Sequence, residues 1–245
     1  MTSEERYLFD LQGFLRIENA LSTEQVAALN ELLDAHVRDE MPTTETTHRF
    51  GSLLDWGEPF RALIDNPRVT PYLNEALGEN FRLDHEYCDV IRSGKGPVGT
   101  SLHGGAAEDD LTAWYRFHNG HLRCGLTVVA YNLADIAPGE GGFGCVPGSH
   151  KANLPLPRAW AEMADAQPIV ERVTGPAGSA VIFTEALSHG TLPWTGKHER
   201  RTLFFKYSPH SLAWAVPHYD ADKYPDLTES QRRALEGPNA RYAGR

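Results

Sequence analysis

Residues 178–189, GSAVIFTEALSH, form a short apolar run that ends in a histidine. Comparable runs lie at other points of the sequence: FRLDHEYCDVI at 81–91, HLRCGLTVVAYNLADI at 121–136 and RRTLFFKYS at 200–208. Each run is rich in β-branched or aromatic residues and is separated from the next by Gly or Pro turns, which is typical of antiparallel strands. The sequence therefore predicts an antiparallel β core over about residues 80–210.

Helical signals cluster toward the two ends of the chain. Three segments predict helices: the run after the capping box Ser22–Gln25, with apolar positions at Val26, Leu29, Leu33 and Val37; Pro71–Leu77; and Thr228–Glu236. Gly78 and Gly237 are the stop signals of the second and third segments. Residues 7–21 alternate apolar and polar positions around Gly13, and this pattern predicts a strand.

The length of the chain fits one domain, because 245 residues and 27.2 kDa are enough to bury a single core. No internal repeat, low-complexity tract or change of composition marks a linker. We therefore expect a single domain over residues 1–245, mainly β with flanking helices, folded as a double-stranded β-helix of the jelly-roll or cupin-like kind.

The charge of the chain excludes some classes of partner. Acidic residues outnumber basic ones 33 to 23, and the formal charge of −10 repels nucleic acid polymers and anionic membrane surfaces. The first residues, MTSEERYLFD, lack the pattern of a secretory signal, and no apolar run approaches the ~20 residues needed to span a bilayer. We expect a cytoplasmic protein with a small-molecule substrate and neither nucleic acid nor membrane partners.

The three cysteines, Cys88, Cys124 and Cys145, are odd in number and widely spaced. They form neither a disulfide framework nor a C-x-x-C metal or redox motif. We expect them to be buried, reduced thiols.

Two histidines are candidate metal ligands because small residues flank each of them: His103 in SLHGG and His189 in ALSHGT. Imidazole suits Fe(II), although a histidine considered alone is more often structural. Eleven positions after His189 (200 − 189), Arg200 opens an apolar strand. A guanidinium at that place can bind a carboxylate through two hydrogen bonds.

With these residues the sequence resembles the phytanoyl-CoA dioxygenase family of Fe(II)/2-oxoglutarate-dependent oxygenases. The family pattern is H-x-D, a distal histidine on a later strand and an arginine about one strand further on. The segments Ala137–Phe143 and Val146–Lys151 belong to the same resemblance, which covers most of the chain. It implies an oxidoreductase that uses Fe(II), with 2-oxoglutarate and O2 as co-substrates, on a double-stranded β-helix.

The resemblance also assigns roles to individual residues. It implies that His103 and His189 bind iron and that Arg200 binds the distal carboxylate of 2-oxoglutarate, supported by Thr191. Because side chains alternate along a strand, Arg200 and Arg201 point to opposite faces, and Arg201 is the alternative if the register differs.

The sequence departs from the family at Gly105, which stands where the pattern has the Asp ligand. The interpretation we slightly favour is a halogenase-type site, in which a halide such as chloride fills the vacant position. A second interpretation is hydroxylation, with the third ligand supplied by Glu108–Asp110, by Glu185 or by a water. A third is a pseudoenzyme that binds a small molecule without catalysis.

Substrate contacts are sought in the segment after the proximal histidine, residues 106–120, because loops line the mouth of the pocket in this fold. Trp114, Tyr115 and His118 are tentative substrate residues. The alternative is that the aromatic side chains pack beneath a lid.

Overall fold

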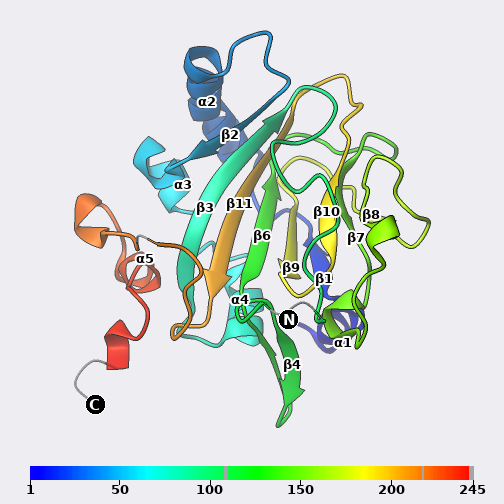
Figure 1. Ribbon diagram of the computed structural model, residues 1–245. Helices are drawn as coiled ribbons and strands as arrows, with labels where there is room; N and C mark the ends of the chain where they lie inside the picture. The colour runs from blue at the N-terminus through cyan, green and yellow to red at the C-terminus, as the bar shows by residue number, and fades with distance from the viewer. Residues whose placement is uncertain (108–109, 217, 243–245) are drawn as a thin grey trace.

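Figure 1 shows a computed structural model of the chain, which describes residues 1–107, 110–216 and 218–242. Within these residues, an antiparallel major sheet has the strand order β1-β9-β6-β11-β3-β2 and a minor sheet has the order β10-β7-β8. The major strands are β1 (Phe14–Ile17), β2 (Thr47–Gly51), β3 (Arg82–Ile91), β6 (Thr127–Asn132), β9 (Ala180–Thr184) and β11 (Arg200–Ser208). The minor strands are β7 (Gly142–Cys145), β8 (Glu171–Arg172) and β10 (His189–Leu192).

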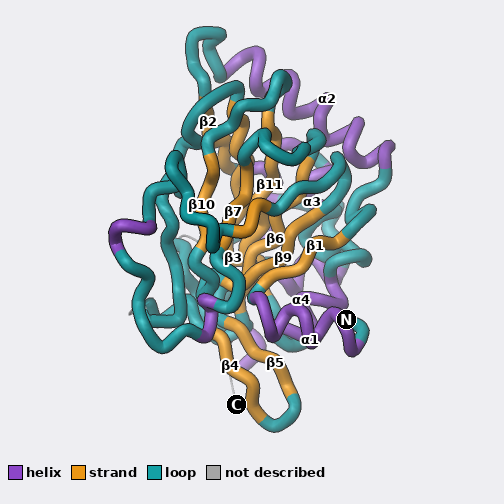
Figure 2. The backbone as a smooth tube through the Cα atoms, turned by 90° about the vertical axis from the view of Figure 1, so that its right-hand side faces the viewer, coloured by secondary structure: helices purple, strands orange, loops and turns teal. Residues whose placement is uncertain are grey.

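The two sheets enclose an apolar interior. Phe143 of β7 packs against Phe183 of β9 with the rings tilted and their centroids 4.6 Å apart, and Val128 and Phe204 of the major sheet belong to the same buried cluster. A separate hairpin, β4 (Tyr115–His118) and β5 (His121–Cys124), projects from one end of the molecule in both views (Figures 1 and 2). This arrangement is the expected double-stranded β-helix.

The helices cover the outer face of the major sheet. Figure 1 shows α2, α3 and α5 on one side of this sheet and β7, β8 and β10 on the other. Leu29 and Leu33 of α2 are buried in one cluster with Val90 of β3 and Leu203 of β11. The α-helices are α1 (Ser3–Gln12), α2 (Thr23–Glu40), α3 (Glu58–Arg61), α4 (Thr70–Leu77) and α5 (Glu229–Ala234). The 3₁₀ turns are η1 (Leu53–Trp56), η2 (Ser149–Lys151), η3 (Arg158–Trp160), η4 (Ala221–Lys223) and η5 (Ala240–Tyr242).

The predicted helices are confirmed, and the predicted capping box is present: the Ser22 hydroxyl accepts from the Gln25 N–H while the Gln25 side chain accepts from the Ser22 N–H. The strand predicted over residues 7–21 is wrong before Gly13. Thr2 and Glu5 form a further capping box that starts α1, and Gly13, with φ +85°, ends it in the left-handed conformation. Only Phe14–Ile17 is a strand.

Two smaller expectations concern the cysteines and the membrane. Cys88, Cys124 and Cys145 are free and buried, as the sequence predicted. Among the described residues, no helix combines the length and apolar character that crossing a bilayer requires.

Candidate metal and co-substrate site

His103 and His189 lie opposite each other because their backbones form an antiparallel bridge. Each N–H donates to the carbonyl oxygen of the other residue, with both N···O distances 2.9 Å. The two imidazole rings are 4.2 Å apart between centroids. The Nδ1 of His103 is 3.0 Å from the Ser101 carbonyl and that of His189 is 2.7 Å from the Leu187 carbonyl. A proton on Nδ1 satisfies these contacts and leaves both Nε2 atoms available as ligands.

Glu185 completes a group of potential metal ligands with the two histidines. It follows β9 directly, and its N–H donates to the Leu126 carbonyl at 2.9 Å. One ligand atom from each of His103, Glu185 and His189 lies within 4.8 Å of the others. Glu185 Oε2 is 3.8 Å from His189 Nε2. Two imidazoles and one carboxylate are the donor set of non-haem Fe(II) oxygenases, so these residues fit the metal.

The protonation states also suit a metal. Burial raises the pKa of Glu185, but Lys206 and then His189 outweigh burial and hold this pKa at about 2, so the carboxyl is ionised. Burial lowers the pKa of His189 to about 4, which leaves a neutral ring at pH 7. A carboxylate and a neutral imidazole are the forms that bind a cation.

The three side chains line a cavity of about 130 Å³ between the sheets. Its walls are the aromatic rings of Tyr87, Phe143, Phe183 and Phe204. The polar lining beyond the three potential ligands is Arg49, Asp89, Thr191, Arg200 and Lys206. The sequence pointed to Thr191 and Arg200 but not to Arg49, Asp89 or Lys206.

Arg200 enters this cavity from the start of β11 and is 1% exposed. Its Nε and Nη1 are buried and have no hydrogen-bond partner among the described residues. Burial lowers the pKa of Arg200, yet a guanidinium remains charged at neutral pH. Because an unpaired buried charge is costly, the arrangement fits a bound anion, and a carboxylate of 2-oxoglutarate has the matching shape.

The other arginines near the site are already paired. Arg49 Nε and Nη2 donate to the two carboxylate oxygens of Asp89 at 2.7 and 2.8 Å, and its guanidinium lies 3.7 Å above the Tyr87 ring. Arg201 points away from the cavity and forms ion pairs with Glu199 and Asp34, each at 2.7 Å. Arg200 alone therefore offers a free guanidinium among the described residues that line the cavity.

Gly105 does not line this cavity. It lines a separate pocket of about 330 Å³ together with the turn at residues 146–149. A Cβ added at Gly105 would lie 2.9 Å from Ser188 Oγ, and the backbone there has φ +123°. Of the acidic alternatives, Glu108 and Asp109 lie outside the described residues, and the exposed Asp110 carboxylate accepts from the Thr112 N–H and hydroxyl.

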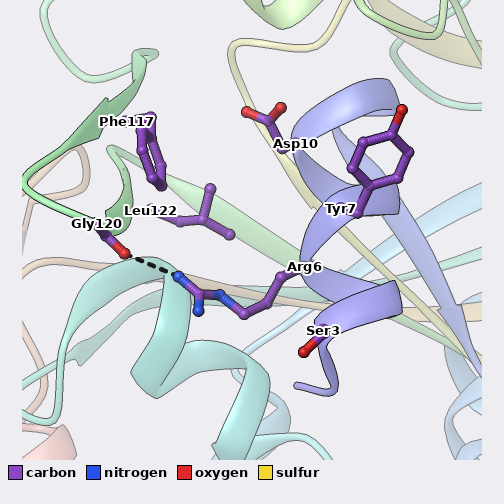
Figure 3. A pocket seen from close by; sticks show the side chains of 7 residues that line it. All are labelled: Ser3, Arg6, Tyr7, Asp10, Phe117, Gly120 and Leu122. Carbon is purple, nitrogen blue, oxygen red and sulfur yellow. Dashed lines mark hydrogen bonds between the residues drawn. The ribbon is translucent and has the colours of Figure 1, made fainter.

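The tentative substrate residues lie on or beside the β4–β5 hairpin and are not among the residues that line the metal-site cavity. The Tyr115 hydroxyl donates to Asp10 of α1, the Trp114 ring lies beneath the Arg116 guanidinium, and His118 is exposed. The hairpin instead borders a cavity of about 440 Å³ beside α1, where Arg6 donates to the Gly120 carbonyl (Figure 3).

Comparisons with known proteins show which family and which solved structures the chain is similar to. The family model for phytanoyl-CoA dioxygenase (PhyH) matches residues 9–202. The crystal structure of HygX from Streptomyces hygroscopicus with nickel and 2-oxoglutarate bound is 27% identical, covers 88% of this chain and 90% of that chain, and has a TM-score of 0.77.

A second structure of HygX, with nickel, 2-oxoglutarate and hygromycin B bound, has 27% identity, the same coverage and a TM-score of 0.75. EctD from S. alaskensis, in its apo form, shares the fold at 17% identity, with 86% of this chain and 78% of that chain covered and a TM-score of 0.65. A search of curated proteins finds no match.

Proposed function

Since the chain belongs to the phytanoyl-CoA dioxygenase family, we propose that its metal site hydroxylates a C–H bond of a small molecule, with Glu185 as the third ligand of Fe(II). Dependence on iron and 2-oxoglutarate follows from the family. The type of atom inserted and the ligand set are our proposal. The observation that carries it is the convergence of His103, Glu185 and His189 within 4.8 Å.

Glu185 supports hydroxylation over halogenation because it supplies the anionic ligand that Gly105 cannot. A halide is needed only where no carboxylate fills the position, and an ionised carboxylate is beside the two histidines here. Gly105 lines the pocket next to residues 146–149 and not the cavity of His103 and His189, which also favours Glu185 over position 105 as the source of the third ligand. The halogenase interpretation that the sequence slightly favoured is therefore the weaker one.

The chemistry comes from the bound cofactors: Fe(II) with O2 and 2-oxoglutarate yields succinate, CO2 and one oxygen atom for the substrate. The residues of the chain bind and orient these components. His103, His189 and Glu185 would hold the metal, and Arg200 would pair with the distal carboxylate of 2-oxoglutarate, with Thr191 beside it. The rings of Phe143, Phe183 and Phe204 give this space apolar walls, and a less polar surrounding strengthens the pairing.

The size of the cavity supports a substrate that binds outside it. A volume of about 130 Å³ is well below the ~300–1,000 Å³ of pockets that enclose drug-sized ligands. We therefore assign this space to the co-substrate. HygX has been crystallised with hygromycin B, and a polar small molecule of that kind is the first class to screen.

The test is to load the protein anaerobically with Fe(II) and 2-oxoglutarate and then to add O2 and candidate substrates, with and without chloride. Succinate release and a product heavier by one oxygen atom, independent of chloride, are expected. A chlorinated product would overturn hydroxylation. If Fe(II) does not bind, or if succinate is absent under every condition, the third interpretation, a binding protein without catalysis, replaces the proposal.

The ligand set has a matched control. Glu185→Gln keeps the size of the side chain but removes its charge, and it should abolish tight Fe(II) binding, as His103→Ala and His189→Ala should. Glu171→Gln, at an exposed position on β8, should leave metal affinity unchanged. Unchanged Fe(II) affinity in the Glu185→Gln protein would exclude Glu185 from the ligand set.

A further inference from the structure

The two carboxylate oxygens of Glu185 face different partners. Oε1 accepts from the Lys206 ammonium at 2.6 Å, whereas Oε2 lies 3.8 Å from His189 Nε2. One oxygen is therefore held by the lysine, and the other is directed toward the histidines. Neither the family resemblance nor the comparisons assign a role to Lys206.

The lysine reaches Glu185 from a distant strand. In the major sheet β6 separates β11 from β9, and Lys206 pairs in register with Val128 of β6, which in turn pairs with Phe183 of β9. Neighbouring strands lie ~4.8 Å apart, so the side chain must cross roughly two strand spacings to meet the carboxylate that follows β9. A long side chain is needed for this contact.

The ion pair is largely buried, with the Lys206 and Glu185 side chains 14% and 12% exposed. The Lys206 ammonium also lies 5.7 Å from the centre of the Tyr87 ring. A charged pair in such a place has a defined geometry, unlike exposed ion pairs, which contribute little and move freely. The orientation of Glu185 is therefore set by Lys206.

We propose that Lys206 is a positioning residue for the metal site: by occupying Oε1 it restricts Glu185 to bind the cation through Oε2 alone. This inference rests on the proposed function, because it requires Glu185 to be a ligand. Restriction to one oxygen leaves a coordination position for 2-oxoglutarate that a carboxylate binding through both oxygens would fill. Arg200, across the same cavity, would hold the far end of that co-substrate.

The experiment compares Lys206→Met, which removes the donor, with Lys206→Arg, which keeps a charged donor of similar reach. Lys223→Met is the matched control, because it removes an ion pair of 2.7 Å with Asp55 that lies outside the cavity lining. Each protein is loaded with Co(II), its visible absorption spectrum is recorded, and 2-oxoglutarate is titrated in. Thermal unfolding is measured on the same samples.

We expect Lys206→Met to change the Co(II) spectrum, to weaken Co(II) binding about 10- to 100-fold, the usual effect of losing a group that orients a metal-ligating side chain, and to weaken 2-oxoglutarate binding as well. Lys206→Arg and Lys223→Met should both have the Co(II) spectrum and the 2-oxoglutarate affinity of the unsubstituted protein. A purely structural lysine would lower only the unfolding temperature. Should Lys206→Met fail to fold, Lys206→Gln replaces it.

Two results separate the inference from its premise. If the unsubstituted protein takes up no Co(II), the proposed function fails. If it binds Co(II) and 2-oxoglutarate but the neutral variants retain the same spectrum and affinity, only the role of Lys206 is overturned. The role of Lys206 is also overturned if Lys206→Arg folds normally but shows the same altered spectrum and affinity as Lys206→Met.

Discussion

Arg200 and Arg201 are neighbours on β11 that extend to opposite faces of the major sheet. Arg200 is buried in the cavity with two guanidinium nitrogens that have no partner in the described part of the chain, while Arg201 forms ion pairs with Glu199 and Asp34. The alternation of a strand thus gives one arginine a structural ion pair and leaves the other available for an anion. The two residues form a natural control for each other.

Arg200→Ala should weaken 2-oxoglutarate binding. Loss of a charge-assisted pair costs about 1.5–3 kcal/mol, which corresponds to a roughly 10- to 150-fold higher Kd. Metal affinity should stay unchanged, because Arg200 is not in the ligand group. Titration of 2-oxoglutarate into the Co(II)-loaded protein measures both effects.

Arg201→Ala is the companion variant and should leave 2-oxoglutarate affinity unchanged. A loss of up to about 1 kcal/mol in unfolding free energy is expected, because its ion pairs are partly exposed. The assignment of Arg200 is wrong if Arg201→Ala gives the larger loss of 2-oxoglutarate affinity.

Gly105→Asp should destabilise the protein without altering the metal site. The backbone φ of +123° disfavours a side chain, and the added Cβ would lie 2.9 Å from Ser188 Oγ. We expect a loss of about 1–3 kcal/mol in the free energy of unfolding, measured with urea. The decisive comparison is the double variant Glu185→Gln with Gly105→Asp, which should bind no more Fe(II) than Glu185→Gln alone. Recovery of Fe(II) binding would return position 105 to the ligand set.

The strands and most helices could be predicted because their signals are local. Apolar runs such as Ala180–Thr184 became buried strands, and the capping box at Ser22–Gln25 starts a helix. The first helix was missed because its starting signal, the capping box of Thr2 and Glu5, lies before the segment whose alternation was read as a strand. Where one segment fits both a strand and a helix, the capping residues at its ends decide between them, and the spacing of apolar residues does not.

The resemblance of the sequence to the family pointed to the two histidines and Arg200, whereas it left several candidates open for the carboxylate, Glu185 among them. Glu185 and His103 are 82 positions apart (185 − 103), and their proximity depends on the bridge between His103 and His189. A signal was nevertheless present: Glu185 directly follows the apolar strand β9, and the oppositely charged Lys206 interrupts the apolar part of β11. The substrate roles of Trp114, Tyr115 and His118 stay predictions, because these residues lie on or beside the hairpin and do not line the metal-site cavity.

Glu86, which does not line the cavity, should make the free energy of unfolding depend on pH. Burial, the largest cause, raises the pKa of Glu86 to about 7 from 4.5, although the N–H groups of Leu54 and Leu53 favour the charged form. Between about pH 4.5 and pH 7, the Glu86 carboxyl therefore keeps its proton in the folded state and loses it in the unfolded state. The stabilisation is complete below about pH 4.5 and is lost as the pH rises through about 7.

Glu86→Gln keeps the shape and removes the titration. Between pH 5 and pH 8 we expect the unsubstituted protein to lose about 2–3 kcal/mol of unfolding free energy that the variant retains. Urea unfolding at the two pH values measures this difference. Equal pH dependence in both proteins would show that Glu86 titrates at an ordinary pKa.

Gly141 and Gly139 share the turn before β7 and have similar backbone angles, φ +100° and +90°. A Cβ at Gly141 would lie 2.1 Å from the Pro193 carbonyl oxygen, whereas one at Gly139 would have no atom of the described residues within 4 Å. Both Ala variants carry the left-handed backbone cost of about 1–2 kcal/mol, so their difference isolates the clash. Because Pro193 follows β10, which carries His189, Gly141→Ala should lower both unfolding free energy and Co(II) affinity, and Gly139→Ala only the former. Equal effects would mean that the turn does not support the metal site.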